Sequence, residues 1–392
     1  MSRVRGPGAE RHGPFVIPII AVCLSLAGCD LGVSTSTPAA TPTQVVNATP
    51  TSPAAVATPA RCGPAAGRRP TATVDEHFNA LFATHPNGWM GADGAYSVPL
   101  PDDRSAWLFG DTILGKPQPD GSVKPSAFIN NSLIVQDRDK LTALHGGTEE
   151  HPVAVITPTD PATWYWAAAG VAEGDKLRVF LLHMKRAGNG TPGFDFTGIG
   201  HAVATLSLPG LKLEGVTQLP FESKVDYNSS VLEEQDYTYI YGLEGVGSNK
   251  YGHVARVPRD RLTSNKWEFY TGAGWSPDPA GAARITSDLS NLSVFKHGSG
   301  YMLVGMETGF GFGKNIIAYY SCSPTGPWTD RTLLYTVPEA TGSIITYLAI
   351  AHPEFSRDGP MLISYCLNNT KPQGGFVSAN IYRPHFIRVT LP

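Results

Sequence analysis

Residues 95–111 read AYSVPLPDDRSAWLFGD, and this stretch decides the fold. Two short runs of strand-forming residues flank the turn residues Pro101-Asp102-Asp103-Arg104, which is the pattern of a β-hairpin. Similar hairpins begin near residues 166, 229, 292 and 350, at spacings of 71, 63, 63 and 58 residues. Because further strand-like runs lie between them, each unit resembles a propeller blade. The sequence therefore predicts an all-β fold, a single five-bladed β-propeller of four-stranded antiparallel blades.

The alternative architecture is a pair of β-sandwich domains. The even spacing of the hairpins across the whole region favours one propeller over two sandwiches. Each unit is longer than the usual propeller repeat of about 40–45 residues, so the loops between strands must be long. We expect only one short helix, at residues 77–82, and the 42 glycines and 33 prolines suit a fold with many turns.

The N-terminus carries an export signal. Arg3, Arg5 and Arg11 form a positive region, and the apolar stretch that follows, 15–28, is too short for a membrane span. The stretch ends in Leu26-Ala27-Gly28-Cys29, which resembles a bacterial lipobox. We therefore expect residues 1–28 to be a lipoprotein signal peptide and Cys29 to carry the lipid. The alternative is an ordinary secretory signal in which Cys29 is incidental.

Residues 31–60 contain no charged and no aromatic residue and are rich in Thr, Pro, Ala, Ser and Val. Such a segment cannot bury enough apolar surface to fold, so we expect residues 29–74 to form a flexible stalk. The globular domain would then span residues 75–392. Lipid and stalk together predict a protein held at the extracellular face of the cell membrane, within the cell envelope.

Charge and cysteine content limit the binding partners, disulfides and metal sites that can be expected. The net charge of −3 gives no reason to expect a nucleic-acid partner. Outside the signal region the cysteines are Cys62, Cys322 and Cys366. An odd number cannot pair completely; the pair considered is Cys322 with Cys366, and two buried free thiols are an equal alternative. No cysteine–histidine cluster has the spacing of a zinc site, and no cofactor is expected. The presence of a structural calcium ion is left as an alternative. We expect a monomer.

Two carboxylates frame the first hairpin. If its turn is centred on residues 102 and 103, Gly94 faces Asp111, and Asp93 and Asp111 share one end of the hairpin. The first strand of a blade is innermost, so this end lies beside the central channel. Carboxylates held so close would have different pKa values, as glycosidic cleavage requires. The alternative is structural: Asp93 is a turn residue and Asp111 bonds local backbone amides.

The first blade also resembles a known family. Its segments Gly91-Ala92-Asp93-Gly94, Ser97-Val98-Pro99-Leu100 and Trp107-Leu108-Phe109-Gly110-Asp111-Thr112 are similar to the opening of a bacterial propeller family first catalogued as a domain of unknown function, whose members are recognised as endo-D-arabinanases. Looser matches continue to about residue 390: Asn130-Asn131-Ser132, Trp164-Tyr165-Trp166, Trp328-Thr329-Asp330, Tyr347, His352-Pro353-Glu354, Ile363-Ser364-Tyr365 and Asn368-Asn369. One departure is Tyr227-Asn228-Ser229, where an aromatic-Gly-Ser run is more usual.

The resemblance implies cleavage of the D-arabinofuranose polymers of mycobacterial-type cell walls, with Asp93 and Asp111 as the acid–base pair. It also points to Asn131 as a substrate-binding residue. Positions at the starts of inner strands add Asp226, Asp288, Asn291, His352 and Glu354 as channel candidates. For His352 and Glu354 the alternative is a structural role where the propeller closes. Trp164 and Trp166 could stack on sugar rings, but we expect at least one aromatic of 164–166 to belong to the core between blades.

The sequence thus predicts an endo-acting glycoside hydrolase that uses two carboxylates, with inversion favoured over retention. Its polysaccharide substrate would be the arabinan of arabinogalactan or lipoarabinomannan. The rival prediction is a non-catalytic carbohydrate-binding or envelope-scaffold propeller. The Gly-rich segment 306–313 lacks the Lys-Ser/Thr of a phosphate-binding loop and is expected to form a rim of the channel.

Overall fold

The computed structural model describes residues 62–392 except 65–68, 118, 120–122, 189–194, 309–311, 357–358 and 372–377. The predicted signal peptide, Cys29 and most of the predicted stalk lie outside the described residues, as does part of the Gly-rich segment 306–313. No helix in the described ranges has the length and apolar character needed to cross a membrane.

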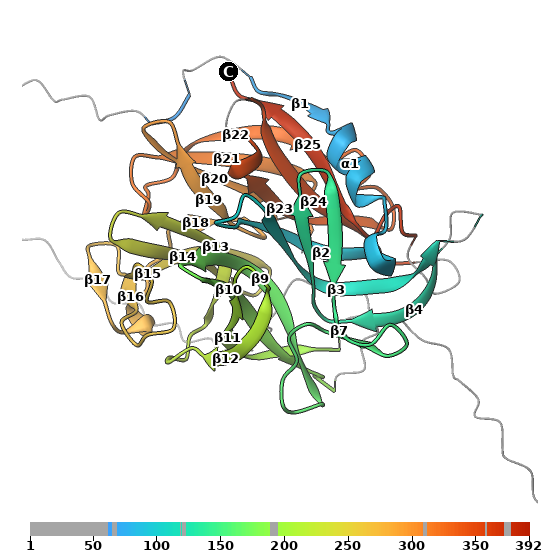
Figure 1. Ribbon diagram of the computed structural model, residues 1–392. Coiled ribbons are helices and arrows are strands. Elements are labelled where there is room, and N and C mark those ends of the chain that lie inside the picture. The colour runs from blue at the N-terminus through green and yellow to red at the C-terminus, as the bar shows by residue number, and fades with distance from the viewer. Residues whose placement is uncertain are drawn as a thin grey trace, which may run out of the picture.

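Five antiparallel sheets are arranged around a central axis (Figure 1). In blades 1 and 2 the strands are β2 (Trp89–Pro99), β3 (Ser105–Pro117), β5 (Ser132–Asp137) and β6 (Lys140–Leu144), then β9 (Thr163–Glu173), β10 (Lys176–Lys185), β11 (Thr197–Ser207) and β12 (Lys212–Gln218). Blade 3 contains β13 (Val225–Glu234), β14 (Tyr237–Val246), β15 (Asn249–Pro258), β16 (Glu268–Tyr270), β17 (Trp275–Ser276) and β18 (Thr286–Ser287). The predicted five-bladed propeller is confirmed.

Blade 4 contains β19 (Ser293–His297), β20 (Gly300–Met306), β21 (Asn315–Ser321) and β22 (Thr329–Thr336). Blade 5 combines β23 (Ile344–His352), β24 (Met361–Asn369) and β25 (Pro384–Thr390) with the first strand of the domain, β1 (Thr71–Val74). The smaller elements are β4 (Val123–Ile129), β7 (Gly146–Gly147), β8 (Pro152–Val153), α1 (Glu76–Phe82) and three short turns of 3-10 helix at Pro86–Gly88, Pro279–Gly281 and Pro353–Phe355. The expected short helix is therefore present as α1.

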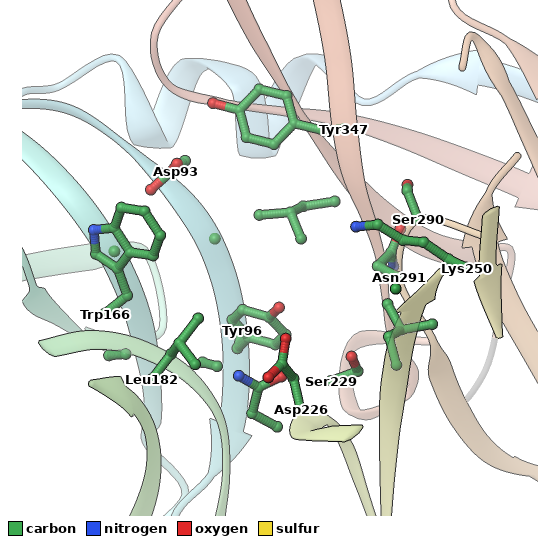
Figure 2. A pocket seen from close by; sticks show the side chains of 18 residues that line it. Asp93, Tyr96, Trp166, Leu182, Asp226, Ser229, Lys250, Ser290, Asn291 and Tyr347 are labelled. Atoms are coloured by element: carbon green, nitrogen blue, oxygen red, sulfur yellow. The ribbon is translucent and has the colours of Figure 1, made fainter. Parts of the chain in front are cut away.

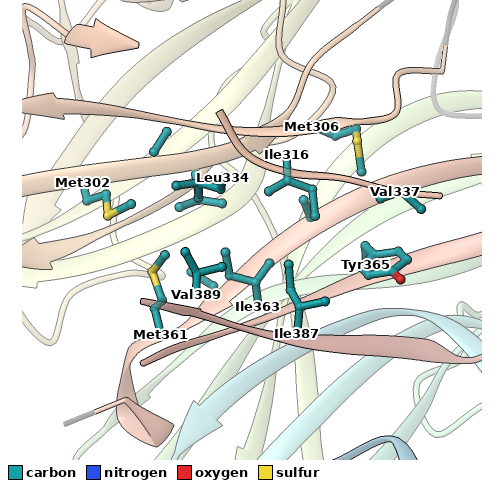
Figure 3. Close-up of a cluster of buried hydrophobic side chains, with 14 of the residues drawn as sticks. Met302, Met306, Ile316, Leu334, Val337, Met361, Ile363, Tyr365, Ile387 and Val389 are labelled. Carbon is teal, nitrogen blue, oxygen red and sulfur yellow. The ribbon is translucent and has the colours of Figure 1, made fainter. Parts of the chain in front are cut away.

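The ring closes through blade 5, where the N-terminal β1 pairs with the C-terminal β25. Each inner strand contacts the inner strand of the next blade, and β23 contacts β2 to complete the circle. Between neighbouring blades lie apolar cores. The core between blades 4 and 5 packs Met302, Met306 and Ile316 against Ile363 and Ile387 (Figure 3). This packing holds the inner strands in fixed positions around the channel.

The alternation of side chains along an inner strand separates core from channel. In β13, Val225 and Tyr227 are buried in the core between blades 2 and 3, while Asp226 and Asn228 are half-buried and face the channel. Successive side chains of a strand point to opposite faces, so polar residues two apart reach the channel together. Alternate residues of an inner strand therefore supply the polar side chains that line the channel.

Two sequence predictions about local structure are wrong. Gly94 pairs with Phe109 and not with Asp111, because the strands next to the turn pair one residue away from the predicted register and a β-bulge between Gly94 and Tyr96 shifts the pairing by one more. The disulfide joins Cys62 to Cys322, 260 residues apart, and Cys366 is a buried free thiol. Cys322 lies at the end of β21 in blade 4, whereas Cys366 lies within β24 of blade 5, so the chain segment before β1 supplies the partner of Cys322.

Candidate active site

A cavity opens where the inner strands of the five blades begin (Figure 2). Its volume is about 140 Å³, well above the roughly 10–15 Å³ that one water needs, so it can hold ligand atoms. Every blade contributes to its wall. The polar side chains that line it are Asp93, Tyr96, Trp166, Asp226, Asn228, Ser229, Lys250, Ser290, Asn291 and Tyr347. We call this end of the propeller the cavity end.

Asp93 enters the cavity from β2 and is 5% exposed. Bulges in the register lie between Ala92 and Gly94 and between Gly94 and Tyr96, and both Gly94 and Ala95 have positive φ angles, 109° and 63°. The bulges re-aim the side chain of Asp93 away from the regular strand direction. The backbone N–H of Gly94 donates to the Sγ atom of Cys366 at 3.4 Å, which ties this bent segment to blade 5.

Asp111 lies on β3 and is 3% exposed. Its Oδ1 atom accepts hydrogen bonds from the side-chain amide of Asn130 at 2.8 Å and from the indole N–H of Trp166 at 2.7 Å. The Tyr382 hydroxyl donates to the Asp111 backbone carbonyl at 3.1 Å. Asp111 itself is not part of the cavity wall, but its neighbour Gly110 and its partner Trp166 are.

Burial raises the pKa values of both carboxyls. Burial is the larger cause for Asp93, and the charge of Asp111 adds to it, so the pKa of Asp93 lies well above its usual value. Burial raises the pKa of Asp111 to about 7, against the opposing effects of the hydrogen bonds from Asn130 and Trp166. The two hydrogen bonds favour the ionised form of Asp111. The pair therefore holds a proton near neutral pH, and Asp93 is the member that keeps it.

The three aromatic residues at the start of β9 divide between core and site. Tyr165 is buried in the core between blades 1 and 2, which confirms that at least one of them is a core residue. Trp166 lines the cavity, donates to Asp111 and packs edge-on against Phe196. Trp164 lies 6.3 Å from the Trp166 ring, does not line the cavity, and has the Arg186 guanidinium above it.

Asp226 lines the cavity from blade 3 and is the third carboxylate at this end of the channel. Its Oδ1 atom lies 2.8 Å from Nε2 of His201, a residue of β11 in blade 2. Figure 2 shows Asp226 across the cavity from Asp93. Asp288, the weaker candidate, is exposed, lies outside the cavity wall, and accepts a hydrogen bond from Ser287.

The two predicted asparagines bridge blades. Asn131 is fully buried outside the cavity wall; its amide donates to the carbonyls of Ile156 and Tyr165 and its Oδ1 accepts from Ile156 N–H. Asn291 also bonds backbone, because its Oδ1 accepts from Met306 and Ala349 and its Nδ2 donates to the Ala349 carbonyl. Only Asn291 additionally lines the cavity.

His352 and Glu354 do not join the carboxylate pair. His352 is fully buried between Ser97 and Ser364, with Nδ1 2.6 Å from one hydroxyl and Nε2 2.8 Å from the other. Burial lowers its pKa to about 3, so it is neutral at physiological pH. It therefore links blade 5 to blade 1. Glu354 lines a separate opening at the other end of the channel, where the later residues of the inner strands form the wall.

Several cavity residues were not predicted. Lys250 and Tyr96 line the cavity, and Cys366 contacts the Asp93 segment. Tyr347 faces Asp93 and slightly offsets the rise in its pKa. Tyr347 and Asn130 lie in segments that resemble the known family, so the resemblance could have identified them as site residues. Lys250 lies in no such segment. Within the described ranges no group of three or more His, Cys, Asp or Glu side chains is arranged to hold a metal ion.

Comparisons with known proteins identify a matching family and solved structures with a similar fold. The model of a family described as "Domain of unknown function (DUF5005)" matches residues 75–391. The crystal structure of a presumed hydrolase from Bacteroides ovatus superposes with a TM-score of 0.69 at 24% identity, covering 82% of this chain and 90% of that one. No curated protein matches the chain.

More distant similarities involve glycoside hydrolases. A GH43_1 enzyme from Xanthomonas citri, solved with xylose, has a TM-score of 0.46 at 13% identity, covering 79% of this chain and 91% of that one. The catalytic domain of a GH62 α-L-arabinofuranosidase from Coprinopsis cinerea has a TM-score of 0.46 at 9% identity, covering 77% and 92%.

Proposed function

The chain belongs to the DUF5005 family, and from the carboxylate pair at its cavity end we propose that it is a glycoside hydrolase. The observation that carries the proposal is the position of Asp93: a buried carboxyl with a raised pKa that lines a cavity beside a second carboxyl. Two carboxyl groups whose pKa values differ are what acid–base cleavage of a glycosidic bond uses.

In the proposed reaction Asp93 is the general acid. Its carboxyl gives its proton to the oxygen of the glycosidic bond as the bond to the anomeric carbon breaks. Asp111, ionised and held by Asn130 and Trp166, takes a proton from the water whose oxygen bonds to that carbon. The leaving sugar gains a hydrogen and the anomeric carbon gains a hydroxyl, so one water is consumed.

We propose arabinan as the substrate, cleaved within the chain at D-arabinofuranosyl linkages. The support is the resemblance of the first-blade segments around Asp93 and Asp111 to endo-D-arabinanases. Trp166 and Asp226 would contact sugar at the cavity wall, the first by stacking and the second by accepting hydroxyl hydrogen bonds. Asn291, which also lines the cavity, would hold this wall in place through its hydrogen bonds to the backbone of Met306 and Ala349.

We also propose that the enzyme is a lipoprotein whose cavity end faces away from the membrane. Cys62 is bonded to Cys322 at the end of β21 and lies against Gly300 at the start of β20. Both positions lie at the end of the propeller opposite the cavity. A stalk that begins at a lipid on Cys29 would therefore reach the domain on the side remote from Asp93, leaving the cavity open to the wall.

The test is hydrolysis of mycobacterial arabinogalactan by the purified full-length protein, followed by chromatography of the products. We expect wild type to release oligosaccharides, and Asp93→Asn and Asp111→Asn each to reduce release by at least about a thousandfold, as loss of a catalytic group does. Undiminished release by both variants would contradict the pair. Binding of the polysaccharide without cleavage by wild type would instead support a non-catalytic carbohydrate-binding propeller.

The stereochemistry gives a second readout. Carboxyl groups about 5–5.5 Å apart accompany retention, and groups about 6.5–9.5 Å apart leave room for the attacking water and accompany inversion. We propose inversion. Proton NMR of the first product formed would distinguish the two, because the inverted anomer would appear before mutarotation.

A further inference from the structure

A second hollow lies between blades 3 and 4, outside the central channel. Its volume is about 420 Å³. Blade 3 contributes Tyr251 at the start of β15 together with Arg284 and the short strand β18, and blade 4 contributes Tyr319 of β21 and Trp328. We call it the aromatic groove. None of these residues takes part in the site around Asp93.

Three half-buried aromatic side chains, Tyr251, Tyr319 and Trp328, line the groove. Tyr319 and Trp328 pack on the apolar core between blades 3 and 4 and are only partly covered by it. Their remaining exposed surface lines the groove. Rings fixed from behind by a core present flat apolar faces at little cost in side-chain entropy, which suits recognition of a flat ligand face.

The groove carries little net charge. The Arg284 guanidinium donates from Nε to Oε2 of Glu244 at 3.0 Å, and its Nη2 lies 2.9 Å from the same oxygen. The guanidinium carbon also lies 3.7 Å from the centre of the Tyr251 ring. Since its charge is already matched by Glu244, Arg284 gives no strong preference for an anion. The remaining polar groups of the wall are the hydroxyls of Thr286 and Ser287 and the phenols.

We propose that the aromatic groove binds a neutral sugar residue of a polysaccharide. A sugar ring has an apolar face that packs on aromatic rings and an edge of hydroxyls that hydroxyl and guanidinium groups can bond. A peptide that binds by adding a strand would find no free edge here, because β15 is paired with β14 on one side and with β16 and β18 on the other.

The groove lies close to the cavity along the chain. Lys250 lines the cavity and the next residue, Tyr251, lines the groove. Because neighbouring side chains of a strand point to opposite faces, a polysaccharide that reached from the cavity to the groove would have to cross the start of β15. This step rests on the proposed function, whereas sugar binding by the groove itself does not.

The experiment measures binding of mycobacterial arabinogalactan to the full-length protein by isothermal titration calorimetry. All proteins carry Asp93→Asn so that the polymer stays intact. We expect Tyr319→Ala and Trp328→Ala each to weaken binding by about tenfold, which corresponds to about 1.4 kcal/mol of binding free energy. The matched control is Tyr335→Ala, which removes a half-buried tyrosine of blade 4 outside the groove.

A further variant keeps the test informative if either alanine variant unfolds. Ser287 is exposed at the groove, so Ser287→Arg obstructs it without removing a buried group, and the same loss is expected. Unchanged affinity in a folded Ser287→Arg or Tyr319→Ala protein would overturn the groove. If wild type releases no oligosaccharides but the groove variants still lose binding, the groove stands and the hydrolase proposal fails.

Discussion

The carboxyl group of Asp93 rests against the α-carbon of Gly110. A Cβ atom at position 110 would lie 2.8 Å from Oδ1 of Asp93, closer than such atoms approach in folded proteins. Gly110 immediately precedes Asp111 on β3, and its lack of a side chain makes room for the carboxyl group of Asp93 on the neighbouring strand β2. The absence of a side chain at position 110 is therefore part of the site.

Gly110→Ala should reduce activity while leaving the fold intact. The new methyl group meets the end of a side chain, which can rotate away, so the backbone need not move. Displacing a catalytic carboxyl by about 1 Å costs on the order of a hundredfold in rate. We expect such a loss of kcat on arabinan with an unchanged melting temperature. The control is Gly215→Ala, where the added methyl meets nothing within 4 Å; equal rates for the two variants would contradict the argument.

Asp93→Asn should stabilise the protein at neutral pH. The folded-state pKa of Asp93 lies well above its usual 3.8, so the folded protein binds a proton that the unfolded chain releases as the pH rises above about 4. Stability conferred by the protonated form is present at low pH and is lost as the pH rises towards the folded pKa. The amide is neutral at every pH and escapes this loss.

The measurement is thermal unfolding of wild type and Asp93→Asn between pH 4 and pH 8. The melting temperature of the variant should exceed that of wild type at pH 8, and the two should converge towards pH 4. Asp102→Asn is a suitable control, because Asp102 is exposed and its pKa is lowered by Arg104. A difference between wild type and Asp93→Asn that does not depend on pH would show that Asp93 is not buried in its protonated form.

Trp166→Phe should shift the pH dependence of activity. The indole N–H bonded to Oδ1 of Asp111 favours the ionised carboxylate, so its loss raises the pKa of Asp111 above about 7. A hydrogen bond to a charged group contributes about 1.5–3 kcal/mol, which corresponds to a shift of about one to two pKa units. The acid limb of kcat/KM should move up by that amount.

Trp164→Phe is the matched control for this shift. Its indole nitrogen is buried and makes no hydrogen bond to any described residue, so the variant loses an N–H without touching Asp111. We expect its pH profile to follow wild type. Parallel shifts in both variants would mean that the ring, and not the hydrogen bond to Asp111, sets the profile.

The propeller could be predicted because each blade begins with a hairpin, and the residues that form a hairpin lie close together in the sequence. Alternating residues and turn residues such as 101–104 need no distant partner to be recognised. The same local signal placed Asp93 and Asp111 at one end of one hairpin. The predicted pairing of Gly94 was wrong for two reasons. The strands next to the turn pair one residue away from the predicted register, and the bulges depend on positive φ angles at Gly94 and Ala95 that strand alternation does not report.

Long-range contacts could not be predicted from the sequence, because they leave no local pattern in it. The Cys62–Cys322 bond joins blade 4 to a segment that precedes the domain, and no spacing rule links two residues 260 apart. The family resemblance pointed to Asn131 as a site residue, and a position at the start of an inner strand pointed to Asn291. The structure uses both to satisfy backbone groups between blades, a need that arises only when two sheets meet.

His352 should make the propeller sensitive to acid, because it is a buried histidine that is neutral in the folded protein. Its folded-state pKa of about 3 lies below the usual 6.5, so the unfolded chain binds a proton that the folded protein does not. Stability should therefore fall as the pH drops from about 6.5 towards 3. His352→Gln keeps a donor and an acceptor for Ser97 and Ser364 but cannot be protonated, so it should reduce this fall when melting temperature is measured between pH 7 and pH 4. His385, whose pKa burial lowers to about 4, supplies a residual slope. The exposed His151→Gln is the control, and an acid sensitivity as steep in His352→Gln as in wild type would exclude His352 as its source.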